Sequence, residues 1–425
     1  MVQTVLKQSK PLFIGIVASL LLMVVTVMLA SSVSNRFMRE QIAYQRNFLL
    51  AEPAIDDWTT CISLLAFAGE PEQRSVLYRA SMVALPVEID EAPCDELTKW
   101  IDAESSRDIN STTYARYWFG GSAVLRLLST FTAGLEATRT LIAALWVIGL
   151  PLYFSLARQR FGVTSCLLLL GAPLLTTDFL SALKTPHVAL SFFVSLVFGI
   201  VTMTSSRSHT NLILFLFGFW LPFFDPLTHP VFYFYIAVAP VVLSLFKSHE
   251  SATVVARTSL LLSVHWVLGY ALSWIMKWSF AGLFGDGLAV FRDSFSQVLF
   301  RASGDVDGKP LGFLDGLDAN VREFLNRPFA TTLVAVFVSY LMLSLLIRMR
   351  RNTSIEFEGV LLCCGITFAP LATFLLLKSH SFEHSWMTYR SIAIAIGLSL
   401  ACLYLRDDRL FFRGAEQIGS KERNA

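Results

Sequence analysis

Two adjacent carboxylates are the clearest candidates for chemistry in this sequence. Asp56 and Asp57 follow Pro53 and precede an apolar run from Ile62 to Phe67. This pattern predicts a helix that starts at the pair and faces a partly buried place. A carboxylate held there can act as a general base on a hydroxyl group. Neighbouring side chains on a helix point about 100° apart, so only one of the two can be the base, and we favour Asp56. An ordinary solvated acidic surface is the competing interpretation.

Further ionisable side chains cluster in the short segments between long apolar runs. Such groups are costly at membrane depth and are more often functional than not. For each one alone an ordinary role stays open, such as a turn carboxylate, a headgroup contact or a cation that reaches for water. The candidate site residues of this kind are Arg116, Asp178, His187, Asp225, His229, His380, Glu383 and His384.

The segment from His380 to His384 has the H-x-x-E-H spacing of one class of zinc peptidases. A zinc site needs a further carboxylate or nitrogen ligand. The segment is a short turn and not a long helix, and the acids that follow it are expected on the opposite side of the membrane. We therefore predict no metal centre and no cofactor, and leave only a divalent cation open.

The composition is that of a membrane protein. Among the 425 residues, 54% are hydrophobic and 16% are charged, and the mean hydropathy is +0.58. Soluble domains carry about a quarter charged residues. The sequence has no glycine-rich phosphate loop, no basic stripe interleaved with aromatic residues and no repeat. Nucleic acid is therefore not an expected partner.

Ten apolar runs are long enough to cross a hydrocarbon layer of about 30 Å, which takes roughly 20 residues, or fewer inside a bundle. The predicted fold class is an all-α membrane protein with about ten transmembrane helices in a single domain over 1–425. The fifth and tenth runs are the shortest. The predicted spans are 11–31, 137–157, 164–183, 187–204, 211–224, 230–246, 258–278, 329–347, 359–377 and 391–405.

Lysine and arginine in the short loops predict the orientation. Most of them fall on the cytoplasmic side if both termini, including a tail over 406–425, are cytoplasmic. Of the cations that then lie outside, Lys277, Arg301 and Arg390 are the ones that need an explanation. An anionic headgroup or a phosphate at the outer leaflet would explain their position. We expect a multi-pass protein of a bacterial inner membrane with a periplasmic or extracellular site.

The first large outer segment covers 32–136. Between 32 and 113 it carries fourteen Asp and Glu against seven Lys and Arg. The stretch from Tyr114 to Gly120, continuing to Arg126, is rich in aromatic and basic residues, which predicts a helix at the membrane surface. Cys61 and Cys94 share this segment, and in an oxidising compartment they can pair. Two cysteines alone leave that pairing open.

The second large outer segment covers 279–328. Its apolar residues recur at steps of three and four, which predicts one face of a helix: Phe284, Leu288, Phe291, Phe295 and Val298. A loop rich in glycine and aspartate follows. The pattern favours a membrane-lying helix and a lid over a site at the outer leaflet. An ordinary connector is the alternative.

These features together resemble the GT-C superfamily of membrane glycosyltransferases, which share many spans and a large first outer loop with surface helices. The resemblance covers the whole chain as architecture. As motif it covers Asp56, Asp57 and, less closely, Asp178, which is similar to an acidic position of the second outer loop. The small size is similar to that of pilin arabinofuranosyltransferases. The sequence lacks a clear DxD, a WWD run and a periplasmic tail domain, which sets it apart from oligosaccharyltransferases.

The resemblance implies a sugar donor carried on a polyprenyl phosphate and a first-loop aspartate as base. The acceptor would be a surface polysaccharide, a lipid-linked glycan or a protein. Glycosyl transfer of this kind needs a base near the acceptor hydroxyl and cations near the phosphate. Two alternatives stay open. A lipid-linked saccharide transporter predicts ionisable residues in mid-span, where only His265 lies, and internal repeats. A membrane acyltransferase would use the pair Asp225 and His229.

Overall fold

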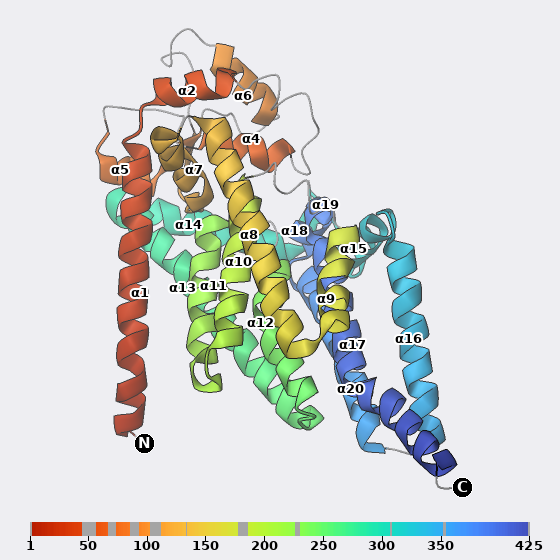
Figure 1. The fold of residues 1–425 in the computed structure, drawn as a ribbon. Helices are drawn as coiled ribbons and strands as arrows, with labels where there is room; N and C mark the ends of the chain where they lie inside the picture. Colours follow the sequence, from red (N-terminus) through yellow and green to blue (C-terminus); the bar gives the residue numbers. More distant parts are fainter. Residues whose placement is uncertain are drawn as a thin grey trace.

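The computed structural model describes residues 2–44, 57–66, 74–85, 93–102, 112–132, 134–176, 186–225, 230–306, 308–351 and 354–423 (Figure 1). It is predominantly helical. The long helices are α1 (Val2–Ser31), α8 (Leu135–Phe161), α9 (Val163–Thr176), α10 (Pro186–Thr204), α11 (Thr210–Phe224), α12 (Pro230–Lys247), α13 (Ala252–Phe284), α16 (Ala330–Arg351), α17 (Ser354–Leu376) and α20 (Arg390–Arg423).

Shorter elements connect the long helices. They are α2 (Asn35–Tyr44), α4 (Asp57–Leu65), α5 (Val76–Ser81), α6 (Pro93–Asp102), α7 (Gly120–Phe131), the 3-10 helix η3 (Arg207–His209), α14 (Leu288–Ser303), α15 (Asp315–Leu325), α18 (Lys378–Glu383) and α19 (Ser385–Thr388). Two small antiparallel sheets pair β1 (Val83–Leu85) with β2 (Thr112–Tyr114) and β3 (Asp305–Val306) with β4 (Lys309–Pro310).

The chain is an all-α multi-pass membrane protein by the length and apolarity of its helices. Among the described residues, six helical segments meet the requirement: Pro11–Ser31, Leu135–Phe161, His187–Thr204, Pro230–Lys247, Ala252–Phe284 and Ser385–Asp407. A seventh results if α15 and α16 are one span bent by 103°. Val163–Thr176 and Val360–Leu376 are apolar but shorter. The predicted set of about ten spans is therefore matched in part.

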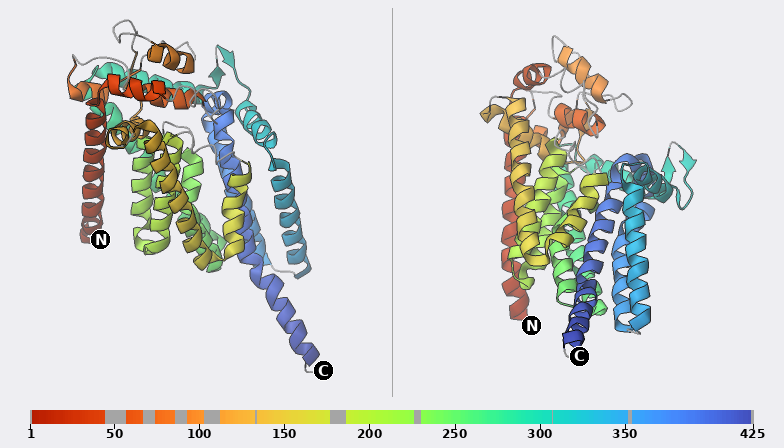
Figure 2. Two further views of the ribbon diagram at one scale, coloured as in Figure 1. Left: turned by 45° about the horizontal axis from the view of Figure 1, so that its top comes forward. Right: turned by 45° about the vertical axis from the view of Figure 1, so that its right-hand side comes forward.

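The long helices run side by side between two ends of the molecule, and both termini lie at the same end (Figures 1 and 2). The short helices of the predicted first and second outer segments gather at the opposite end, together with α18 and α19. Segments far apart in the sequence therefore meet there.

The closest pair of long helices is α11 and α13. A Cβ atom at Gly218 would lie 2.1 Å from the Trp266 carbonyl oxygen, and one at Gly269 would lie 2.0 Å from the Phe215 carbonyl oxygen. Small residues allow helix backbones to approach in this way, and they are common at helix interfaces in membranes. A larger residue at either position would force the two helices apart.

The sequence predicts a helix over the aromatic and basic stretch from Tyr114 to Arg126, and only its second part, from Gly120, is helical. Residues Tyr114 to Phe119 form the end of β2 and an irregular segment, and Phe119 has a left-handed backbone (φ 52°) before α7 begins at Gly120. Trp118 is fully buried and donates a hydrogen bond from Nε1 to the Ser273 carbonyl of α13, at 3.2 Å. The stretch packs inside the fold because its indole finds this acceptor.

A disulfide joins Cys61 of α4 to Cys94 of α6, with Cα atoms 5.1 Å apart. The sequence left the pairing of these two cysteines open, and the structure joins them. On its other side α4 meets α10, where the Ser63 hydroxyl lies 2.9 Å from Nδ1 of His187. Both of these side chains are buried. Two contacts of different kinds therefore hold α4 in place.

The second outer segment contains the predicted amphipathic helix. Leu288, Phe291, Phe295 and Val298 lie on α14, and their side chains are exposed by 84%, 37%, 60% and 42%. Phe284 is the last residue of α13 and does not belong to α14, because α13 ends with its C-cap at Gly285. The exposed apolar face of α14 runs across the ends of the long helices (Figure 1). At the other end of the molecule, α20 continues to Arg423 through the range predicted as a tail.

Candidate functional site

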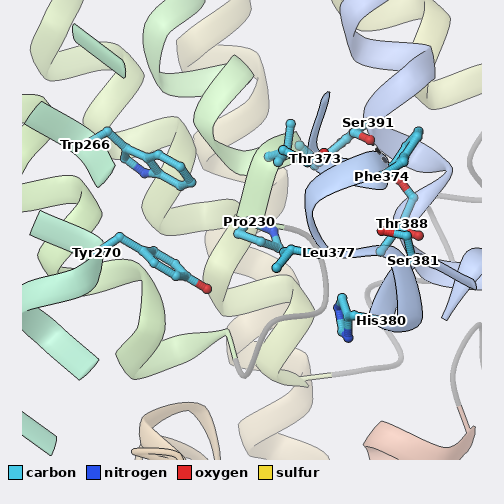
Figure 3. Close-up of a pocket in the computed structure, with 12 residues that line it drawn as sticks. Pro230, Trp266, Tyr270, Thr373, Phe374, Leu377, His380, Ser381, Thr388 and Ser391 are labelled. Carbon is cyan, nitrogen blue, oxygen red and sulfur yellow. Dashed lines mark hydrogen bonds between the residues drawn. The ribbon is translucent and has the colours of Figure 1, made fainter. Parts of the chain in front are cut away.

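A cavity of about 180 Å³ lies between α12, α13, α17 and the α18–α20 segment (Figure 3). Its wall is mainly apolar, with hydroxyl and imidazole groups along one side. The lining residues are Pro230, Val231, Phe232, Trp266, Tyr270, Thr373, Phe374, Leu377, His380, Ser381, Thr388 and Ser391. The cavity therefore suits an apolar chain that carries a polar group at one end.

The α13 wall belongs to a row of aromatic rings. Trp266, Tyr270, Trp274 and Trp278 follow each other at steps of four residues, which places them on one face of a helix. Successive ring centroids lie 5.2, 6.3 and 6.1 Å apart. The row runs from the cavity toward the end of α13. Trp266 Nε1 is buried and makes no hydrogen bond with any described residue.

Two histidines stand at the other side of the cavity. His380 lines it, and its ring centroid lies 4.7 Å from that of His384. Burial, together with the nearby Arg301 guanidinium, lowers the pKa of His384 to about 4. His384 is therefore a neutral imidazole at pH 7, able to accept a proton or a hydrogen bond but not to act as a cation. Glu383, between them, is exposed.

The turn that holds these histidines is anchored to the second outer segment. The Gly304 amide donates a hydrogen bond to the Ser379 hydroxyl at 3.0 Å, and Lys378 Nζ donates to the Leu311 carbonyl at 2.8 Å. The end of α14 and the start of α18 are thereby joined. These contacts hold the histidine side of the cavity against the end of α14 that carries Arg301.

Arg301 is a cation with electrostatic contacts to this arrangement. Its guanidinium donates a hydrogen bond to the Tyr117 hydroxyl and lies over the same ring, 5.8 Å from the centroid. It also acts on His384 and on Tyr270. The side chain is only partly buried. The guanidinium is therefore not fully enclosed by the fold.

Arg301 packs on Tyr117, which belongs to a stack with Tyr114 and Arg116. The Tyr114 and Tyr117 rings are stacked with centroids 5.2 Å apart, and Arg116 lies over Tyr114 at 4.5 Å. Arg116 also forms a salt bridge with Asp293 of α14 at 3.1 Å. Burial raises the pKa of Tyr114, so this phenol stays neutral. This segment thus contacts α14 through the Arg116–Asp293 ion pair and through Tyr117, on which Arg301 of α14 lies.

Lys277 is differently placed, although the sequence grouped it with Arg301. Its side chain is 0% exposed, its ammonium donates a hydrogen bond to the Ser81 carbonyl at 2.7 Å, and it lies over the Trp118 ring at 5.5 Å. These contacts join α13 to α5. In this position the lysine holds the first outer segment on the bundle.

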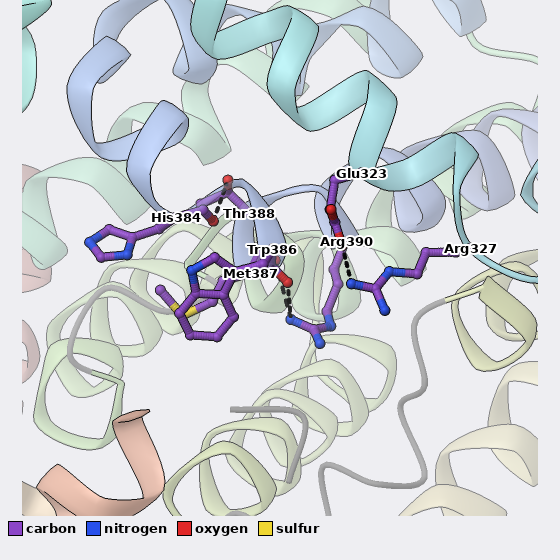
Figure 4. A network of polar contacts seen from close by, with 7 residues as sticks. All are labelled: Glu323, Arg327, His384, Trp386, Met387, Thr388 and Arg390. Atoms are coloured by element: carbon purple, nitrogen blue, oxygen red, sulfur yellow. Dashed lines mark hydrogen bonds and ion pairs between the residues drawn. The ribbon is translucent and has the colours of Figure 1, made fainter. Parts of the chain in front are cut away.

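Arg390 lies within a polar network at the corner between α18 and α20 (Figure 4). It is 3% exposed, donates a hydrogen bond to the Trp386 carbonyl at 3.2 Å and lies over the Tyr389 ring at 5.0 Å. The Arg327 guanidinium also lies over the Tyr389 ring, 4.8 Å from its centroid, and forms a salt bridge with Glu323. Arg390 therefore stabilises the corner that carries the histidines.

The remaining predicted site residues fall into two groups. Asp225 ends α11, is 0% exposed and interacts electrostatically with Tyr270, whereas His187 contacts Ser63 as described above. Asp56, Asp178 and His229 lie outside the described residues, and Asp57 is described only as the first residue of α4.

Sequence reasoning missed Trp266, Tyr270 and Tyr117 as members of the site. The four-residue spacing of aromatic residues from 266 to 278 was a usable signal, because it places them on one helix face. For Tyr117 no such signal existed, since its position depends on the irregular backbone before Gly120.

No protein-family model, curated protein or solved structure matches this chain. Its function is therefore argued from the geometry of the site.

Proposed function

We propose that this chain is a membrane glycosyltransferase that takes its sugar from a polyprenyl-phosphate donor and passes it to a cell-envelope acceptor. One observation carries the proposal. An apolar cavity at the level of the helix ends is lined by His380 and Tyr270, the neutral His384 lies next to His380, and the Arg301 guanidinium acts electrostatically on His384 and Tyr270. A lipid phosphate needs this combination, because its chain stays in hydrocarbon while its charge needs a cation.

Arg301 is the residue that we assign to the donor phosphate. Charge on the leaving phosphate grows as the glycosidic bond breaks, and a fixed cation stabilises that charge most in a place with little water. Lys277 and Arg390, which the sequence offered for the same task, serve in our proposal as packing cations. Both side chains are buried, and they donate to the Ser81 and Trp386 carbonyls.

The general base remains in the first outer segment in our proposal. Asp57 begins α4, and α4 is held by the Cys61–Cys94 disulfide and by the contact of Ser63 with His187. A base must keep its distance to the acceptor hydroxyl, so a doubly held helix suits the role. His384, which is neutral at pH 7, is the second proton acceptor near the cavity.

The sidedness follows from the same disulfide. Disulfides persist in oxidising compartments such as the periplasm. The end of the molecule that carries the disulfide therefore faces away from the cytoplasm in our proposal, and both termini face the cytoplasm. This agrees with the arginine and lysine distribution of the short loops.

One observation argues against the transporter alternative. His265, the mid-span ionisable residue on which it depends, contacts the Leu261 carbonyl of its own helix at 2.7 Å through Nδ1. A residue that handles a substrate in a central cavity would face that cavity. Among the described residues, His265 is absent from the cavity lining.

The test is a deletion strain analysed for lipid-linked sugars by mass spectrometry. We expect one polyprenyl-phosphate sugar to accumulate and to disappear when the wild-type gene is restored. Restoration with Asp56→Asn or Asp57→Asn should fail for the true base, because general base catalysis contributes about 10²-fold to 10⁴-fold. The neighbouring position should restore the wild type, since asparagine caps a helix nearly as well as aspartate. An unchanged lipid profile in the deletion strain would refute the proposal.

A further inference from the structure

Helix α14 packs on the bundle with one face and leaves an apolar stripe exposed on its outer side. The inner face holds Val290 and Ser294, which are buried, and Val290 belongs to an apolar cluster with Ala281 of α13. The members of the apolar stripe recur at steps of three and four residues, so they share one face of the helix. They are all exposed: Leu288, Phe291, Phe295 and Val298.

A polar stripe lies beside the apolar one. It consists of Arg292, Asp293 and Ser296, and all three are exposed. Consecutive residues on a helix point about 100° apart, so Phe295 and Ser296 face different surroundings although they are neighbours in the chain. A helix with an apolar and a polar side next to each other fits the surface of a lipid layer, where acyl chains lie on one side and water on the other.

The position of α14 is that of such a surface. The helix runs across the ends of the long helices, at the end of the molecule opposite both termini (Figures 1 and 2). It follows α13, which is long and apolar enough to cross a membrane. Exposed apolar side chains continue to the end of α13, where Leu283 and Phe284 are 78% and 43% exposed. The apolar surface of a spanning helix therefore leads directly into the stripe of α14.

We infer that α14 is a membrane anchor that lies in the plane of the lipid surface. Its apolar stripe enters the acyl chains of the leaflet at the end opposite the termini, and its polar stripe stays in water. The occupant of the apolar stripe is lipid, because the stripe continues the surface of a spanning helix and contacts with lipid remove it from water. The inference goes beyond the proposed function and does not rest on it.

The anchor has a consequence for the cavity. The Gly304 amide, directly after α14, donates a hydrogen bond to the Ser379 hydroxyl in the turn that holds His380 and His384. A helix fixed at the lipid surface therefore also sets the level of this turn relative to the leaflet.

The test compares cysteines on the two stripes in the full-length protein, with one chain in each nanodisc of phosphatidylcholine and phosphatidylglycerol. Phe295→Cys and Ser296→Cys form one pair, and Phe291→Cys and Arg292→Cys form the other. A negatively charged, water-soluble maleimide is added, and the adducts per chain are followed by intact mass. The thiolate reacts, and its fraction falls in apolar surroundings. Phe295→Cys and Phe291→Cys should therefore react at least about 10-fold more slowly than their partners.

The wild type supplies the background of this measurement. Three of its free cysteines, Cys166, Cys363 and Cys402, are buried. A variant that failed to fold would expose them and carry several adducts per chain, so a loss of fold is recognised and the other pair then decides.

Equal rates within the pairs would overturn the inference, because the two stripes would then share the same surroundings. A covalent dimer of Phe295→Cys, formed under mild oxidation in larger vesicles, would place a second copy of the chain on the apolar stripe. That result would also overturn the inference, since lipid would not be the occupant.

Discussion

Lys277 and Arg301 carry the same charge, and the sequence offers the same reason to suspect both. The structure places them in opposite situations. Lys277 is 0% exposed and its ammonium is taken up by the Ser81 carbonyl, whereas Arg301 is partly buried and contacts the Tyr117 hydroxyl beside the cavity. A cation on the disfavoured side of a membrane therefore has two distinct uses. One fastens a segment to the bundle, and the other can meet an anionic ligand.

Replacing Arg301 should have the largest effect on activity. Arg301→Met removes the charge that we assign to the leaving phosphate, and the loss of one such stabilising donor lowers turnover about 10²-fold to 10³-fold. Arg301→Lys should recover part of the activity, because it keeps the charge without the planar fork. Turnover is measured in reconstituted vesicles, with the unfolding midpoint as a check.

Arg292→Met is the matched control for that variant, because Arg292 is an exposed arginine of the same helix α14. It should retain full turnover. Equal losses in Arg292→Met and Arg301→Met would mean that the charge of α14 as a whole matters, and the special place of Arg301 would be lost.

Replacing Lys277 should act on stability and not on chemistry. Lys277→Met leaves the Ser81 carbonyl without its donor, which costs about 1–3 kcal/mol of unfolding free energy. Protease cleavage within α5 should become faster, since α5 loses its attachment to α13. Turnover per folded molecule should stay close to that of the wild type. Normal stability combined with lost turnover would return Lys277 to the phosphate role.

The smallest expected effect concerns His384 and pH. The pKa of this ring is about 4 in the folded chain against an ordinary value of 6.5, because of burial and the Arg301 charge. As the pH falls from 6.5 toward 4, the unfolded chain takes up a proton and the folded chain does not, so stability decreases over this window. His384→Asn should show a smaller decrease of the unfolding midpoint there. Parallel curves for the two proteins would contradict this placement of His384.

The sequence was sufficient for the apolar helices and for the end at which polar residues meet. Hydrophobic runs of spanning length are a strong signal, because the bilayer leaves few alternatives to a helix. It was insufficient for the stretch from Tyr114 to Phe119, whose aromatic residues suit a surface helix and a buried segment equally. The left-handed backbone of Phe119 and the acceptor for Trp118 decide between them, and both depend on α13.

The same limit applies to the candidate site. Charge and spacing identified Arg301, His380, His384 and Asp225, which the structure brings to the cavity region. They could not separate Arg301 from Lys277, because the Ser81 carbonyl that occupies the lysine is 196 residues away in the sequence. The first-loop base stays a prediction, since the side chains of Asp56 and Asp57 lie outside the described residues.

The most direct measurement of the central claim is native mass spectrometry of the full-length protein with added polyprenyl phosphate. The wild type should retain one lipid phosphate per chain. Lys277→Met should retain it as well, whereas Arg301→Met should lose it at the same lipid concentration. Retention by Arg301→Met together with loss by Lys277→Met would reverse the assignment of the two cations and contradict the account of the site.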